Sequence, residues 1–185
     1  EAVANGISRA GFGVDVIGMV PIPVANFCTW RASLGDKPYL AGVYITASHN
    51  PAEYNGIRFR HPDGAGYTEG NIEIKRMFFE ELAEDHSEVG KINMLSTEEE
   101  LKTYTDFVKS KVGNLEGMRI AIDPGNGVGS VIIDELFQKF GVETFCINNE
   151  PDGSFPNRPS EPAPKNLSKL ISIAEAGNFN FSVAY

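Results

Sequence analysis

Segments with the pattern of β-strands alternate with segments spaced like α-helices along this chain of 185 residues. The first kind is short, apolar and rich in β-branched residues, whereas the second repeats its apolar residues every three or four positions. The expected strands cover residues 14–20, 40–46, 57–60, 118–122, 142–147 and 178–185. The expected helices cover residues 3–10, 24–34, 74–82, 101–112, 131–140 and 167–174. This alternation predicts an α/β fold built of mixed-sheet layers with helices on both faces.

The chain is expected to divide into two units. Composition shifts over residues 91–97, just before Ser96-Thr97-Glu98-Glu99, a sequence typical of a helix start. We therefore predict one domain over residues 1–95 and a second over residues 96–185. The first residue is not Met and lies inside a helical pattern, and the last residues have a strand pattern. We expect the chain to be an excised piece of a longer protein.

Charge and composition exclude several classes of function. The 16 Lys and Arg are outnumbered by 25 Asp and Glu, for a net charge of −9, so the chain lacks the basic surface that nucleic acids need. No apolar run approaches the roughly 20 residues of a membrane span. Cys28 and Cys146 lie far apart, match no metal-ligand spacing and suit a reduced, cytoplasmic protein. We expect no nucleic-acid or membrane partner, while the oligomeric state stays open.

The segment most informative about chemistry is a polar loop after the second expected strand, at residues 46–59. A serine nucleophile needs exposure, a nearby proton acceptor, and cations or amides that stabilise the transferred charge. Ser48 would be that nucleophile, with His49, Arg58 and the loop amides as its partners. Adjacency of serine and histidine is weak evidence by itself, because neighbours on an extended chain point apart. A polar surface loop without chemistry is the alternative.

The run Thr-Ala-Ser-His-Asn-Pro at residues 46–51, followed by Tyr-Asn-Gly-Ile at residues 54–57, closely resembles the active-site loop of the α-D-phosphohexomutases. That family includes phosphoglucomutases, phosphomannomutases and phosphoglucosamine mutases. Further similar segments occur in the family's order at residues 16–23, 120–129, 151–157 and 159–167. The resemblance covers nearly the whole chain and implies parts of two consecutive phosphohexomutase domains, the first truncated at its N-terminus and the second at its C-terminus.

The resemblance implies a phosphotransferase that interconverts hexose 1-phosphate and hexose 6-phosphate through a hexose 1,6-bisphosphate, which also serves as activator. Ser48 would carry the phosphoryl group, with His49 as a second catalytic residue and with Asn50 and Asn55 binding substrate or phosphate. The implied cofactor is Mg²⁺, held by Ser48 through its phosphate and by an acidic loop expected beyond Tyr185. We therefore expect no activity from residues 1–185 alone.

One position departs from the family pattern. The family usually has lysine after Asn-Gly-X, whereas this chain has Arg58. Lysine can lose a proton and act as a general base, but arginine practically cannot, and its planar fork suits phosphate binding. We predict that Arg58 clamps charge, and the general base stays open. The alternative is an exposed basic residue without a catalytic role.

Three other functions are considered. The glycine turn at residues 125–129 suggests a nucleotide-binding module, but its third glycine follows two residues after the second, where the dinucleotide fingerprint needs three. A serine-dependent metal phosphatase would need a ligand cluster, and His49, His61 and His86 have no such spacing. A catalytically inactive sugar-phosphate-binding protein is the third alternative. The identity of the hexose stays open.

Overall fold

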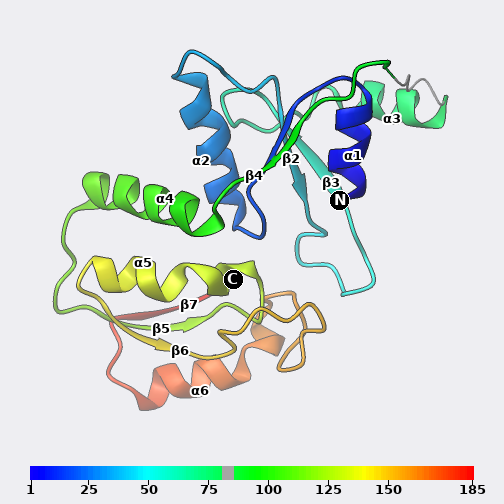
Figure 1. The fold of residues 1–185 in the computed structure, drawn as a ribbon. Coiled ribbons are helices and arrows are strands. Elements are labelled where there is room, and N and C mark those ends of the chain that lie inside the picture. The colour runs from blue at the N-terminus through cyan, green and yellow to red at the C-terminus, as the bar shows by residue number, and fades with distance from the viewer. Residues whose placement is uncertain (81–85) are drawn as a thin grey trace.

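The computed structural model describes residues 1–80 and 86–185, which form three small sheets with helices packed on them (Figure 1). A parallel sheet has the strand order β6 (Glu143–Cys146), β5 (Arg119–Asp123), β7 (Phe181–Ala184). A parallel pair joins β1 (Val14–Val16) to β4 (Ile92–Met94), and an antiparallel pair joins β2 (Gly42–Ile45) to β3 (Ile57–Arg60). The helices are α1 (Ala2–Arg9), α2 (Ile22–Ser33), α3 (Asn71–Phe79), α4 (Thr97–Val112), α5 (Ile133–Lys139) and α6 (Ser168–Ala176).

Helices cover both faces of the β6-β5-β7 sheet, because alternate side chains of β5 point to opposite faces. Ile120 and Ile122 are fully buried on the face where Ile133 of α5 packs. Ala121, between them, packs with Leu170 of α6 on the other face, and α5 and α6 lie on opposite sides of the sheet in Figure 1. Each buried isoleucine contributes about 1.5–3 kcal/mol relative to an exposed one. The predicted α/β fold with helices on both faces is confirmed.

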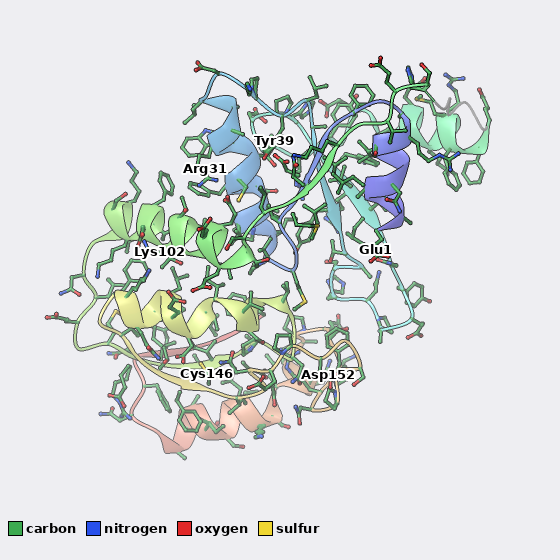
Figure 2. All side chains as sticks on the ribbon, viewed as in Figure 1. Glu1, Arg31, Tyr39, Lys102, Cys146 and Asp152 are labelled. Carbon is green, nitrogen blue, oxygen red and sulfur yellow. The ribbon has the colours of Figure 1, made fainter. Side chains whose placement is uncertain are left out.

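Helices α2 and α4 pack together and connect the two halves of the molecule. The ring centroids of Phe27 on α2 and Phe107 on α4 lie 4.9 Å apart. Arg31 of α2, labelled in Figure 2, donates a hydrogen bond of 2.7 Å to Glu100 of α4. The same core includes Ile132, just before α5. The β6-β5-β7 sheet is therefore held against the first half of the chain by apolar contact, and the loop after β6 faces the loop between β2 and β3.

Most of the expected elements are observed, several of them with shifted ends, and the structure explains two of these differences. The strand expected over residues 14–20 ends at Val16, because the Ile17 carbonyl accepts a hydrogen bond of 2.8 Å from Thr97 Oγ1 and Gly18 turns the chain with a φ of 77°. The helix expected over residues 131–140 begins only at Ile133, after a 3-10 turn over Val128–Val131.

Strand β4 was not expected from the sequence. It lies inside the composition shift and has only three residues, too few for a period of two to be recognised. Leu82, assigned to the third expected helix, lies outside the described residues. The domain boundary after residue 95 stays a prediction. None of the helices within residues 1–80 and 86–185 combines the length and the apolar character that crossing a membrane requires.

Candidate active site

The polar loop at residues 47–55 is the connection between β2 and β3. The Thr46 amide donates to the Gly56 carbonyl at 2.9 Å and closes the base of the loop. A Cβ atom on Gly56 would lie 2.7 Å from the Thr46 carbonyl oxygen, so only glycine fits this close approach. Figure 1 shows the loop extending from the end of the hairpin toward the connection between β6 and α6.

Ser48 has a backbone conformation that few residues other than glycine adopt. Its φ is 60°, in the left-handed region, and its amide donates to Thr46 Oγ1 at 3.0 Å. The side chain is exposed, and Ser48 Oγ lies 3.5 Å from Nδ1 of His49, at the limit of a hydrogen bond. Because the chain turns at Ser48, the two neighbouring side chains meet instead of pointing apart as they would on an extended strand.

The five residues predicted to form the site line one open hollow of about 330 Å³. Ser48, His49 and Asn50 come from the first part of the loop, Asn55 from its end, and Arg58 from β3. Arg58 is exposed and makes no ion pair with a carboxylate anywhere in residues 1–80 and 86–185. The hollow therefore offers a hydroxyl, an imidazole, two amides and an unpaired cation to a small anionic ligand. The roles of these side chains stay predictions.

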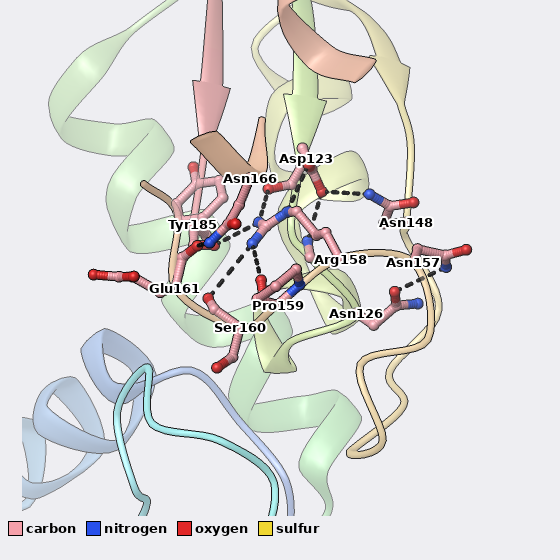
Figure 3. Close-up of polar contacts among 11 residues, drawn as sticks. Asp123, Asn126, Asn148, Asn157, Arg158, Pro159, Ser160, Glu161, Asn166 and Tyr185 are labelled. Atoms are coloured by element: carbon pink, nitrogen blue, oxygen red, sulfur yellow. Dashed lines mark hydrogen bonds and ion pairs between the residues drawn. The ribbon is translucent and has the colours of Figure 1, made fainter. Parts of the chain in front are cut away.

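A buried arginine, which the sequence analysis did not identify, organises the neighbouring loop (Figure 3). Arg158 Nε donates to Asp123 Oδ2 at 2.8 Å, and the two side chains are only 5% and 2% exposed. Nη2 of Arg158 donates to the Tyr185 carbonyl at 2.9 Å, and Nη1 donates to the Pro159 carbonyl at 2.9 Å. Arg158 therefore ties the loop between β6 and α6 to the ends of β5 and β7.

The same loop contacts the Ser48 loop directly. The Ser160 hydroxyl donates to the His49 carbonyl at 2.6 Å and lies 3.0 Å from the Asn50 carbonyl. A second open hollow, of about 450 Å³, is lined by residues 51–53 on one side and 154–160 on the other. The loop between β6 and α6 and the Ser48 loop thus form one continuous surface.

The first three amides of the glycine turn after β5 are already used inside the protein. The amides of residues 125, 126 and 127 donate within the protein, to Asp123 Oδ1, the Asn148 carbonyl and the Pro124 carbonyl, at 2.8, 2.8 and 3.0 Å. A Cβ atom on Gly125 would lie 2.3 Å from Arg158 Nη2, so the arginine fills the space above the turn. Gly125 thus serves close packing against Arg158, which argues against the nucleotide-binding alternative.

The described residues do not form a metal site by themselves. In residues 1–80 and 86–185 no group of three or more His, Cys, Asp or Glu side chains is arranged to hold a metal ion. Magnesium needs oxygen ligands in near-octahedral geometry, and around Ser48 the described residues place amides, an imidazole and a guanidinium instead of carboxylates. Among the described residues, Ser48 is therefore the one candidate ligand for the expected Mg²⁺.

Comparison with known proteins identifies relatives for both halves of the chain. Residues 1–85 match the sequence model described as phosphoglucomutase/phosphomannomutase, alpha/beta/alpha domain I, and residues 101–185 match the model for domain II. A protein of Methanobrevibacter smithii named "Probable phosphoglucosamine mutase" is 35% identical over all of this chain and 41% of its own length. A phosphoglucomutase/phosphomannomutase of Thermococcus kodakarensis is 31% identical over all of this chain and 40% of its own length.

Solved structures agree on the fold. A phosphoglucomutase/phosphomannomutase family protein of Burkholderia thailandensis matches with a TM-score of 0.84 and 25% identity, over 100% of this chain and 40% of that one. A putative phosphomannomutase of Thermus thermophilus matches with a TM-score of 0.76 and 23% identity, over 99% of this chain and 42% of that one. The chain spans about 40% of the length of the curated relatives it matches.

Proposed function

Because this chain belongs to the phosphoglucomutase/phosphomannomutase family, we propose that it forms the phosphate-carrying part of a phosphohexomutase, with Ser48 as the residue that carries the phosphoryl group. The observation that carries the proposal is the hollow in which exposed Ser48, with its left-handed backbone, meets His49, Asn50, Asn55 and Arg58. The substrate class is a hexose phosphate.

In the proposed reaction, phosphorylated Ser48 donates its phosphoryl group to the free hydroxyl of a hexose monophosphate. The bond between phosphorus and Ser48 Oγ breaks while the bond to the sugar oxygen forms, and the sugar hydroxyl loses its proton to a base. The resulting bisphosphate turns around, and Ser48 Oγ takes back the other phosphoryl group. Each cycle therefore moves the phosphate and regenerates the phosphoserine.

The residues around Ser48 suit this chemistry electrostatically. A phosphoserine carries a charge of about −1.5 to −2 near neutral pH, which needs compensation by cations and hydrogen-bond donors. Arg58 supplies a permanent charge and a planar pair of donors for phosphate oxygens. His49, 3.5 Å from Ser48 Oγ, is placed to hydrogen-bond the phosphate or to move a proton. Arginine does not deprotonate, so the general base of the reaction stays open.

The test is direct detection of phosphate on Ser48. The polypeptide that contains this chain is incubated with Mg²⁺ and glucose 1,6-bisphosphate, and the tryptic peptide of residues 32–58 is analysed by mass spectrometry. We expect one phosphate per molecule on Ser48, and no phosphate on the corresponding peptide after the same treatment of a Ser48→Ala variant.

Other outcomes would point to other functions. If the phosphate on Ser48 appears but is lost to water faster than to added glucose 1-phosphate or mannose 1-phosphate, the protein is a serine-dependent phosphatase. An unmodified Ser48 in a folded protein that still binds the bisphosphate would contradict a transferase and favour an inactive sugar-phosphate-binding protein. Residues 1–185 alone are expected to show no turnover, and turnover by that purified chain would refute this expectation.

A further inference from the structure

One hydroxyl group from the loop between β6 and α6, that of Ser160, contacts the backbone of the Ser48 loop. Ser160 donates to the His49 carbonyl at 2.6 Å, and the Asn50 carbonyl lies 3.0 Å from the same oxygen. These carbonyls belong to the two residues that directly follow Ser48. In Figure 3 the Ser160 side chain points away from Arg158, toward the first half of the molecule.

Ser160 is held in place by groups that cannot move easily. Its own carbonyl and the Pro159 carbonyl accept hydrogen bonds from Nη1 of Arg158, at 3.4 and 2.9 Å. Arg158 is buried and bonded to Asp123, and Pro159 restricts the backbone between the arginine and Ser160. The position of the Ser160 hydroxyl therefore follows from the buried arginine and the end of β5.

The Ser48 loop needs such support, because the left-handed conformation of a serine persists only where surrounding contacts enforce it. On its N-terminal side Ser48 is supported by Thr46, whose Oγ1 accepts from the Ser48 amide at 3.0 Å. On the C-terminal side of Ser48, the backbone carbonyls of residues 49 and 50 accept hydrogen bonds from Ser160, which lies outside the Ser48 loop.

We propose that Ser160 is a positioning residue for Ser48, which holds the left-handed turn and the direction of Ser48 Oγ by bonding the backbone carbonyls of His49 and Asn50. Ser160 touches neither substrate nor phosphate. The inference rests on the proposed role of Ser48 as phosphate carrier, and it extends that role to the opposite half of the chain. A docking contact alone would stabilise the two halves without affecting phosphoryl transfer.

The test compares three variants of the polypeptide that contains this chain. Ser160→Ala removes the hydroxyl, Ser160→Thr keeps it, and Ser172→Ala removes an exposed serine of helix α6 as the matched control. Each protein is phosphorylated with glucose 1,6-bisphosphate and then mixed with saturating glucose 1-phosphate, and loss of phosphate from Ser48 is followed in a single turnover. Thermal unfolding midpoints and the ³¹P resonance of the phosphoserine are recorded on the same samples.

We expect Ser160→Ala to slow transfer by about five- to tenfold. When the same transfer is followed over a range of glucose 1-phosphate concentrations, the half-saturating concentration should change by less than twofold, because no sugar contact is lost. The phosphoserine resonance should broaden or shift, and Ser160→Thr should restore both rate and resonance. A Ser160→Ala rate within twofold of the unchanged protein, or a loss that only parallels a lower unfolding midpoint, would overturn the proposal.

Failure of the proposed function gives a different result. In that case the unchanged protein gains no phosphate on Ser48, and hydrogen exchange then decides the question of positioning. The peptide of residues 46–56 should exchange faster in Ser160→Ala than in the unchanged protein and in Ser172→Ala. Equal exchange in all three proteins would refute the positioning role even without phosphorylation.

Discussion

Replacement of Arg158 by methionine should destabilise the fold strongly. Methionine keeps much of the side-chain length but removes the charge, so the variant leaves Asp123 Oδ2 without the 2.8 Å hydrogen bond from Arg158 Nε at a site where the aspartate is 2% exposed. Removing one partner of such a buried pair typically costs about 3–5 kcal/mol, because the other charge stays buried and uncompensated. Asp123 Oδ1 keeps its bonds from the Gly125 amide and Asn148, at 2.8 and 2.9 Å.

The assay is equilibrium unfolding by urea and by heat, followed by circular dichroism. For a chain of this size, 1 kcal/mol corresponds to roughly 2–4 °C, so we expect the midpoint to fall by about 10 °C. The matched control is Arg119→Met in the same sheet. Arg119 pairs with Glu143 at 3.0 Å, but these side chains are 42% and 65% exposed, and its loss should cost about 1 kcal/mol or less.

A double-mutant cycle separates the pair from its surroundings. Asp123→Asn combined with Arg158→Met should cost less than the sum of the single changes, by about 2 kcal/mol, because the double variant no longer buries an unpaired charge. Additive effects, or a single Arg158→Met cost as small as that of the Arg119 control, would refute the view that the buried ion pair organises this loop.

Two further predictions concern α2 and α4. Burial, together with the hydrogen bond to Glu100, raises the pKa of Cys28 from 9.0 to about 12. The thiol should therefore alkylate slowly at pH 8 in the folded protein. The free energy of unfolding should fall as the pH rises above 9, because the unfolded thiol then loses its proton whereas the folded thiol keeps it. Iodoacetamide kinetics and unfolding between pH 8 and 10 check this, and rapid alkylation without unfolding would contradict it. Ser96→Ala should cost about 1 kcal/mol in urea unfolding, because Ser96 Oγ accepts from the Glu99 amide at 3.2 Å; no change would mean that other groups cap the helix.

The sequence predicted the secondary structure where a pattern extends over several residues. The α4 helix ends at Val112 as its spacing indicates, and it begins directly after the predicted cap residue Ser96, four residues before the first apolar position of that spacing. Strand β5 was predicted because the apolar residues of 118–122 are interrupted only by Arg119 and are followed by a glycine-rich turn. Patterns of three residues carry too little information, and β4 was missed for that reason. Strand β1 was overextended, because the hydrogen bond from Thr97 that replaces strand pairing at Ile17 comes from a distant segment.

The loop of the candidate site was predicted from the sequence, but the residues that support this loop were missed. Ser48, His49 and Asn50 belong to a recognisable motif, and with Asn55 and Arg58 they line one hollow. The motif does not reveal the left-handed backbone at Ser48, which brings the Ser48 side chain close to His49. An arginine in a proline-rich loop is ordinarily exposed, so nothing in the local sequence marks Arg158 as a buried residue.

The sequence by itself determined the order of strands and helices apart from β4, the identity of the polar loop and the resemblance that points to Ser48. Each of these depends on residues close together in the chain. Only the tertiary structure decided that Arg158 is buried against Asp123, 35 residues away, and that Ser160 reaches the backbone after Ser48, more than 100 residues away. Such contacts form when the packing of α2, α4 and α5 brings two loops together, and that geometry is a property of the folded core, not of either loop.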